Sequence, residues 1–148
     1  MSLTIEVQGL RELSDKLKQL PDKLRKKVLR GAVSTAAKIV QAAAIQLAPE
    51  YTGEVSQGHA PPGTLKRAIF RKHVRDSEHD ETFIVGVKSG KKFQKKNLDA
   101  FYWRFVEFGT VKMPAHPFLR PAFEANKEKA VQAIKQALAE GLDKVARE

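Results

Sequence analysis

Residues 101–123 read FYWRFVEFGTVKMPAHPFLRPAF, and this stretch concentrates large apolar side chains in one part of the chain. It holds the only Trp and five of the eight Phe among 148 residues. Aromatic surface is costly to leave in water, so these side chains are expected to be buried in the chain's own core or against another chain. We expect most of the stretch to belong to the core and part of it to form an assembly surface.

The first half of this stretch predicts a short helix. Three aromatic residues recur at spacings of four and three and therefore share one helical face: Phe101, Phe105 and Phe108. Tyr102 and Val106 lie beside that face. Gly109 suits the left-handed conformation that often ends a helix.

The second half predicts an extended segment followed by a long helix. Three prolines hold the backbone extended: Pro114, Pro117 and Pro121. The last helix is expected to begin at Pro121 or Ala122, because proline suits the first helical turn. One apolar stripe runs along it: Val131, Ile134, Leu138, Leu142 and Val145. We assign structural roles to Gly109, Pro117 and Pro121.

Upstream, the sequence predicts a strand over residues 3–7 and two helices. The first helix carries one apolar stripe: Leu10, Leu13, Leu17 and Leu20. Pro21 marks a bend, and a long helix is expected from Asp22 to Ala48. In its second half Lys38 is the only charge, so we expect that half to be surrounded by protein. No stretch approaches the roughly 18 apolar residues of a membrane span.

Two loops and a hairpin complete the predicted fold. Residues 49–64 and 89–98 are predicted to be mobile loops, the first because it is rich in Pro and Gly. Between them, 65–74 and 81–88 predict an antiparallel hairpin. The fold class that we predict is α+β, a single domain over 1–148. Its small antiparallel sheet packs against a long central helix and a C-terminal helix.

The composition says more about possible binding partners than about catalytic activity. A net charge of +10 suits contact with a polyanion, and it equally suits a solvated surface. One basic cluster opens the long helix: Lys23, Arg25, Lys26, Lys27 and Arg30. The candidate polyanion contacts lie further on: Lys91, Lys92, Lys95, Lys96, Arg71 and Lys72. The absence of Cys excludes disulfides and a Cys nucleophile, and the first seven residues do not read as a signal peptide.

Glu107 and His116 are among the chemical candidates in the sequence. Glu107 could be a general base, but we favour a structural carboxylate that pairs with Arg104 or Arg120 or accepts N–H bonds near Gly109. His116 has no second His nearby in sequence, so we do not expect a metal ligand. The sequence shows no phosphate-binding Gly loop and no Ser nucleophile motif. It predicts neither an enzyme nor a cofactor.

The same stretch resembles a known family pattern. The residues that carry the resemblance are Tyr102, 105–110, Pro114, Ala115, Pro117, Phe118 and 120–122. Leu20 with Pro21 before the long helix, and Ala48, Pro49, Thr52 and Gly53 after it, also match. The pattern is similar to a minor tail protein family of long-tailed lambdoid bacteriophages, the gene product ten-like family of tail-completion and head–tail joining proteins. Residues 54–62 depart from it as an insertion.

The resemblance implies a structural subunit without catalytic residues. Members are similar to ring-forming proteins that cap the tail tube and help to join it to the DNA-filled head, as hexamers. We therefore expect self-association, other tail or neck proteins as partners and no membrane. Assembly is expected in the bacterial cytoplasm, and residence in the virion. A basic DNA-binding module is the alternative. The predicted interface residues are Trp103, Phe108, Lys112, Met113, His116, Phe118 and Arg120.

Overall fold

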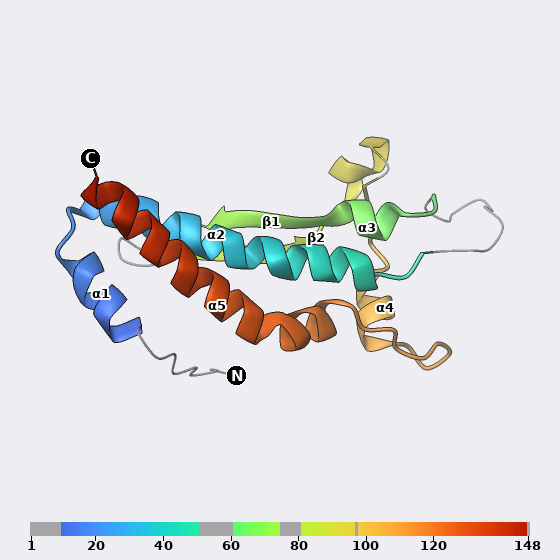
Figure 1. Ribbon diagram of the computed structural model, residues 1–148. Coiled ribbons are helices and arrows are strands. Elements are labelled where there is room, and N and C mark those ends of the chain that lie inside the picture. The colour runs from blue at the N-terminus through green and yellow to red at the C-terminus, as the bar shows by residue number, and fades with distance from the viewer. Residues whose placement is uncertain (1–9, 51–60, 75–80, 97, 148) are drawn as a thin grey trace. The chain divides into compact units, whose positions relative to one another are not determined.

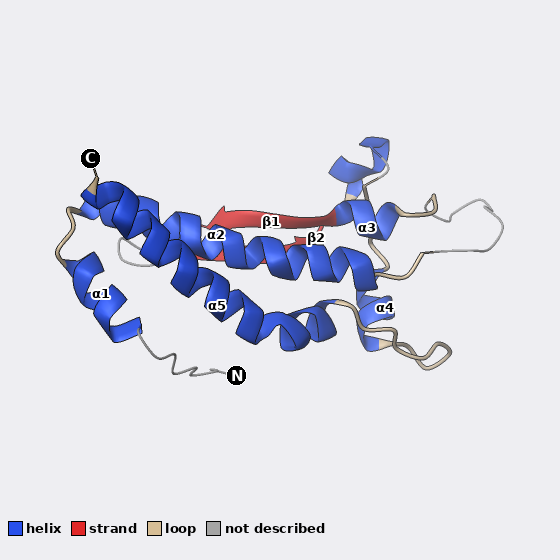
Figure 2. Cartoon of the chain, in the orientation of Figure 1, coloured by secondary structure: helices blue, strands red, loops and turns tan. Residues whose placement is uncertain are grey.

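The computed structural model describes residues 10–50, 61–74, 81–96 and 98–147 (Figure 1). Its elements are α1 (Leu10–Lys18), α2 (Asp22–Leu47), α3 (Thr64–Ala68), β1 (Ile69–Val74), β2 (Thr82–Val87), the 3-10 helix η1 (Lys91–Lys96), α4 (Trp103–Phe108) and α5 (Leu119–Ala146). The two strands pair as an antiparallel sheet, and the rest of the described structure is mainly helical (Figure 2). The predicted α+β class is confirmed.

The chain forms two compact units, and α2, α5 and the hairpin each pass from one into the other. Unit 1 comprises residues 1–37, 73–83 and 128–148, and unit 2 comprises residues 38–72 and 84–127. We describe each unit by itself. The single domain predicted over 1–148 stays a prediction.

Unit 1 is built on leucine and valine. Its buried core residues are Leu17 from α1, Val28 and Ala32 from α2, and Leu138 from α5. Partly buried apolar residues pack around them: Leu13, Leu20, Ile134, Leu142 and Val145 from the predicted stripes, with Leu29 and Ala137. A Cβ at Gly141 would lie 2.9 Å from a methyl carbon of Val28, so α5 closely approaches the first half of α2 in this unit (Figure 1). The two amphipathic patterns read from the sequence are confirmed.

Unit 2 has a core of small residues around one large ring. The buried set is Ala44, Ala48, Leu65, Ala68, Ile69, Ala100, Phe118 and Ala122. Gln41 joins the second half of α2 to β1, since its side-chain amide donates to the Ile69 carbonyl at 3.2 Å. On β2, Val85 and Val87 face this core while Ile84 is exposed, as the alternation predicted. The Phe70 ring lies 3.2 Å from where a Cβ of Gly86 would be, so glycine there leaves room for the ring.

Three details of the predicted secondary structure are wrong. Residues 64–68 form α3 rather than the start of a strand, because Thr64, Leu65 and Ala68 are buried together at helical spacing. The Thr64 hydroxyl also donates to the Pro61 carbonyl at 2.6 Å. Within the second predicted loop, residues 91–96 form η1, and α5 begins at Leu119 instead of Pro121.

The environment of α2 differs from the prediction. Its second half is not surrounded by protein in this structure, since Leu47 is 48% exposed and Ala42 is also exposed. By length and composition α2 could cross a membrane, which the sequence reading excluded: an 18-residue window has a mean hydropathy of 1.2. Core helices of soluble proteins pass the same test, and α2 supplies buried residues to the core of each unit.

Some predictions fall outside the described residues. They concern the strand over 3–7, most of the loop over 49–64, and the hairpin turn at 76–80.

Candidate functional site

Helix α4 turns its aromatic face away from the core of unit 2. Phe101, Phe105 and Phe108 are 58%, 51% and 75% exposed. On the other side, Tyr102, Trp103 and Val106 pack against the buried core. Phe105 and Phe108 share an exposed face of α4, as their spacing predicted, whereas Phe101 is exposed in the turn that precedes the helix.

The loop after α4 extends this surface. Val111 is fully exposed and Met113 is 37% exposed. The loop is closed by the Thr110 N–H, which donates to the Met113 carbonyl at 2.8 Å, and by the Met113 N–H, which donates to the Thr110 hydroxyl at 3.0 Å. The His116 N–H donates to the Val106 carbonyl at 2.8 Å and ties the loop to α4. We call Phe101, Phe105, Phe108, Val111 and Met113 the apolar surface.

The turn between α4 and the loop requires glycine. Gly109 has φ +76°, and its N–H donates to the Phe105 carbonyl at the end of α4. A Cβ at this position would lie 2.8 Å from the backbone N of Ala115. Positive φ and a backbone contact this close both exclude an ordinary side chain. Gly109 is the C-cap of α4, as the sequence predicted, but its ψ of 173° differs from the predicted left-handed helical conformation.

Glu107 fixes the start of α5. Its carboxylate accepts N–H bonds from Phe118 (2.8 Å), Leu119 (3.1 Å) and Arg120 (3.0 Å). A carboxylate that satisfies the free N–H groups of a first helical turn also complements the helix dipole. The residue is 7% exposed. Both oxygens are therefore engaged in holding α4 against the beginning of α5.

The sequence predicted two possible roles for Glu107, pairing with an arginine or acceptance of backbone N–H bonds, and the structure supports only the second. Acceptance of backbone N–H bonds is correct in kind, but the donors are residues 118–120 and not the neighbourhood of Gly109. Pairing with an arginine is wrong. Arg120 binds Glu124 at 3.1 Å, and the Arg104 guanidinium lies 5.5 Å from the centre of the Trp103 ring.

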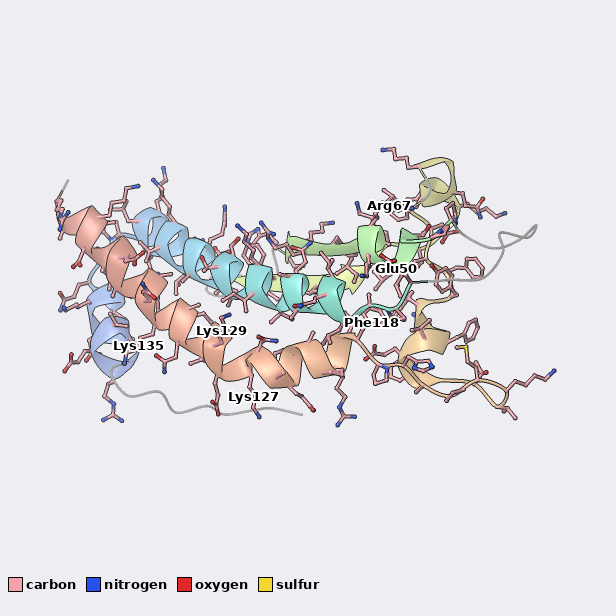
Figure 3. The ribbon with its side chains drawn as sticks, turned by 45° about the vertical axis from the view of Figure 1, so that its right-hand side comes forward. Glu50, Arg67, Phe118, Lys127, Lys129 and Lys135 are labelled. Carbon is pink, nitrogen blue, oxygen red and sulfur yellow. The ribbon has the colours of Figure 1, made fainter. Side chains whose placement is uncertain are left out.

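The structure redistributes the predicted interface residues. Phe118 is completely buried in the core of unit 2, so its assignment as an interface residue is wrong (Figure 3). The Glu107 carboxylate binds the backbone of residues 118–120 and so fixes the backbone that carries Phe118. Trp103 is half-buried. The other predicted residues are exposed: Phe108, Lys112, Met113, His116 and Arg120.

Sequence reasoning did not assign three members of the apolar surface, namely Phe101, Phe105 and Val111. The spacing of the phenylalanines identified their common face, but nothing in it says whether that face points inward. The sequence feature that could have indicated its orientation is Glu107. It lies on a different face of the helix, and its carboxylate needs hydrogen-bond donors if it is buried. A carboxylate buried for capping turns the phenylalanine face toward solvent.

The predicted polyanion contacts come from two elements, η1 and β1. Lys91, Lys92 and Lys96 are exposed on η1, and the Lys95 side chain lies outside the described part. Asp99 holds this segment by accepting from the Gly90 N–H at 2.7 Å and from the Gln94 amide at 3.3 Å. Arg71 donates to Gln41 on α2 at 2.8 Å, while Lys72, the next residue along β1, belongs to the opposite face of the strand.

Comparison with known families assigns the chain. A family model described as "Bacteriophage HK97-gp10, putative tail-component" matches residues 11–109. The chain belongs to this family. The chain is thus a bacteriophage tail component, as the resemblance predicted. The matched range includes Phe101 and helix α4 with the exposed Phe105 and Phe108, and it ends at Gly109, before Val111 and Met113. Neither the curated proteins nor the solved structures yield a match.

Proposed function

We propose that this tail component is a tail-completion or head–tail connector subunit that assembles into a ring of identical copies at the neck or tail end. The resemblance described above suggests six copies. The observation that carries the proposal is the apolar surface: five large apolar side chains exposed on backbone that is fixed by Glu107, Gly109 and the closed loop. Contiguous exposed apolar groups on a soluble protein mark interaction sites.

The energetics suit assembly in the particle rather than strong association of free chains. Burying one large apolar side chain contributes roughly 1.5–3 kcal/mol, so five contribute on the order of 10 kcal/mol as an upper estimate. Association itself costs about 4–15 kcal/mol in lost freedom of motion. The apolar surface alone would give weak self-association of free chains. Binding of several copies to the same tail would supply the additional free energy for ring assembly.

The occupant that we propose for the apolar surface is a neighbouring copy of the chain. A ring built from identical subunits uses two different surfaces of each copy, one against each neighbour. The remaining large apolar side chains that are exposed among the described residues are Leu47, Ile84 and Phe123, and all three belong to unit 2. They provide apolar groups for the second surface without any contribution from unit 1.

Pre-organisation supports the same proposal. An interface gains affinity when its residues are already held in the bound geometry, because less conformational entropy is lost on binding. The loop of the apolar surface is closed at Thr110 and Met113 and tied to α4 through His116. Glu107 and Gly109 serve this arrangement and no chemical step. We propose no catalytic activity for the chain.

The test is complementation of a phage or prophage that lacks the wild-type gene. The Phe108→Ser, Val111→Ser double variant should fold, because both side chains are exposed, and should lower the yield of joined particles at least tenfold. Lys129→Ser, at an exposed position of α5, is the control and should complement normally. Circular dichroism of each purified chain checks the fold. Normal particle yield with the folded double variant would overturn the proposal.

A further inference from the structure

A basic hollow lies in unit 1, apart from the residues used above. Four cations line it, all from the first half of α2: Lys23, Lys26, Lys27 and Arg30. Gly31, Ser34 and Phe83 complete the lining, and its volume is about 640 Å³. The hollow therefore combines four positive charges with one aromatic ring and one hydroxyl.

Most of this charge is not neutralised by the described residues. Arg30 is the one cation of the four that takes part in an ion pair of the described structure, with Glu81 at 3.3 Å. Glu81 is in turn hydrogen-bonded to His73, so the Arg30 guanidinium is held in place. None of Lys23, Lys26 and Lys27 forms an ion pair with another of the described residues.

The spacing of the cations is unfavourable for the helix itself. Lys23 with Lys27, and Lys26 with Arg30, are like-charge pairs four residues apart, each of which destabilises a helix by roughly 0.2–0.5 kcal/mol. Over residues 23–30 the helix rises by about 10 Å, so the charges follow a line and not a point. Such a line suits a ligand that carries several negative charges in a row.

Gly31 adds an independent observation. A Cβ at Gly31 would meet none of the described residues within 4 Å, so no contact with them requires glycine there. Glycine in a helix interior costs about 1 kcal/mol relative to alanine. At the hollow it exposes bare helix backbone and permits close approach by a ligand.

We propose that this hollow binds the phosphate backbone of DNA, independently of base sequence. Lysine is depleted at protein–protein interfaces, whereas it is a standard contact for phosphates as a compact point charge. Three of the four cations are lysines, which favours a nucleic acid over an acidic protein partner.

The experiment measures binding of the full chain to a fluorescently labelled 20-base-pair duplex by anisotropy over a series of salt concentrations. Each phosphate contact contributes about 0.9 to the slope of log K against log salt. The Lys23→Gln, Lys27→Gln variant should reduce that slope by about 1.8. The matched variant Lys91→Gln, Lys92→Gln removes the same charge from η1 and should change the slope by less than half as much.

Gly31→Leu provides a second arm without a change of charge. It should weaken binding severalfold while the salt slope and the helix content stay the same, because the leucine occupies the approach to the helix backbone. Three results would overturn the proposal: no duplex binding at low salt, equal slope losses in the two lysine pairs, or displacement of DNA by polyglutamate at equal charge concentration. The last would assign the hollow to an acidic protein segment.

Discussion

The two units use their apolar residues in opposite ways. In unit 1 the leucines and valines of α1, α2 and α5 meet in a core, and lysines occupy the outer face of α2. In unit 2 five of the eight buried core residues are alanines, while every large apolar side chain that is exposed among the described residues belongs to this unit. The exposed large apolar side chains of the described residues thus all lie in unit 2, which also carries most of the net positive charge of the sequence.

This difference shows how a small protein can have both a stable core and an apolar surface. Alanines allow close approach of α2, α3 and α5 around Phe118, so one ring fills much of the space that several larger side chains would need. The other four phenylalanines of the 101–123 stretch are exposed: Phe101, Phe105, Phe108 and Phe123. Unit 2 is the part that we propose for assembly, and unit 1 is the part that we propose for contact with a polyanion.

The largest expected effect separates the two kinds of phenylalanine in unit 2. Phe118→Ala should lower the free energy of unfolding by about 3–5 kcal/mol, because it leaves a cavity in a core of small residues. Phe108→Ala should change it by less than about 0.5 kcal/mol, since that ring is exposed. Urea unfolding followed by circular dichroism measures both. Similar losses for the two variants would contradict the contrast between core and surface.

Next in size is the loss of the carboxylate that caps α5. Glu107→Gln keeps the shape of the side chain but removes the charge that accepts three N–H bonds, and should cost about 2–3 kcal/mol. Thermal unfolding gives the value, and Glu124→Gln serves as the control because Glu124 is exposed on the same helix. Equal stability of the two variants would mean that Glu107 does not organise the junction of α4 and α5.

Two glycines, one in each unit, should respond in opposite directions. Gly109→Ala should destabilise the chain by about 1–3 kcal/mol, because φ is positive and the backbone of Ala115 leaves no room for a Cβ. Gly31→Ala should stabilise it by about 0.5–1 kcal/mol, because the position is helical and open. Chemical denaturation of the purified variants distinguishes them. If Gly31→Ala destabilised the chain, the added methyl group would have to clash with another part of the chain, which would contradict the open position described above.

The smallest effect concerns the pH dependence of unit 1. Burial raises the pKa of the Glu81 carboxyl, but Arg30 and His73 together outweigh it and lower the pKa below the ordinary value of 4.5. A carboxyl with a lowered pKa stabilises the fold above the pKa of the unfolded chain, and this contribution disappears as the pH falls through the folded-state value. Glu81→Gln should therefore cost about 1 kcal/mol at pH 7 and progressively less below pH 4.5. A constant difference between pH 7 and pH 3 contradicts this.

The sequence predicted the helices and strands better than the surface. Stripes such as Leu13 with Leu17, or Leu138 with Leu142, identify amphipathic helices because helical spacing and burial repeat together. The strand predicted from Leu65 failed because its apolar residues also fit one turn of helix, and only the bond of Thr64 to Pro61 decides between them. In α4 the many apolar residues predicted burial. In the structure Glu107 is buried instead, and Phe105 and Phe108 are exposed. That outcome depends on donors eleven to thirteen residues away, which no local pattern contains.

The central claim is that the apolar surface contacts a neighbouring copy of the chain in the assembled particle. The most direct test is photo-crosslinking in assembled tails, with a benzophenone side chain at position 108 and, as control, at position 129. The account predicts a crosslinked dimer of the chain from position 108, mapped by mass spectrometry to residues of unit 2, and none from position 129. No dimer from position 108, or a crosslink from there to a different tail protein, would contradict it.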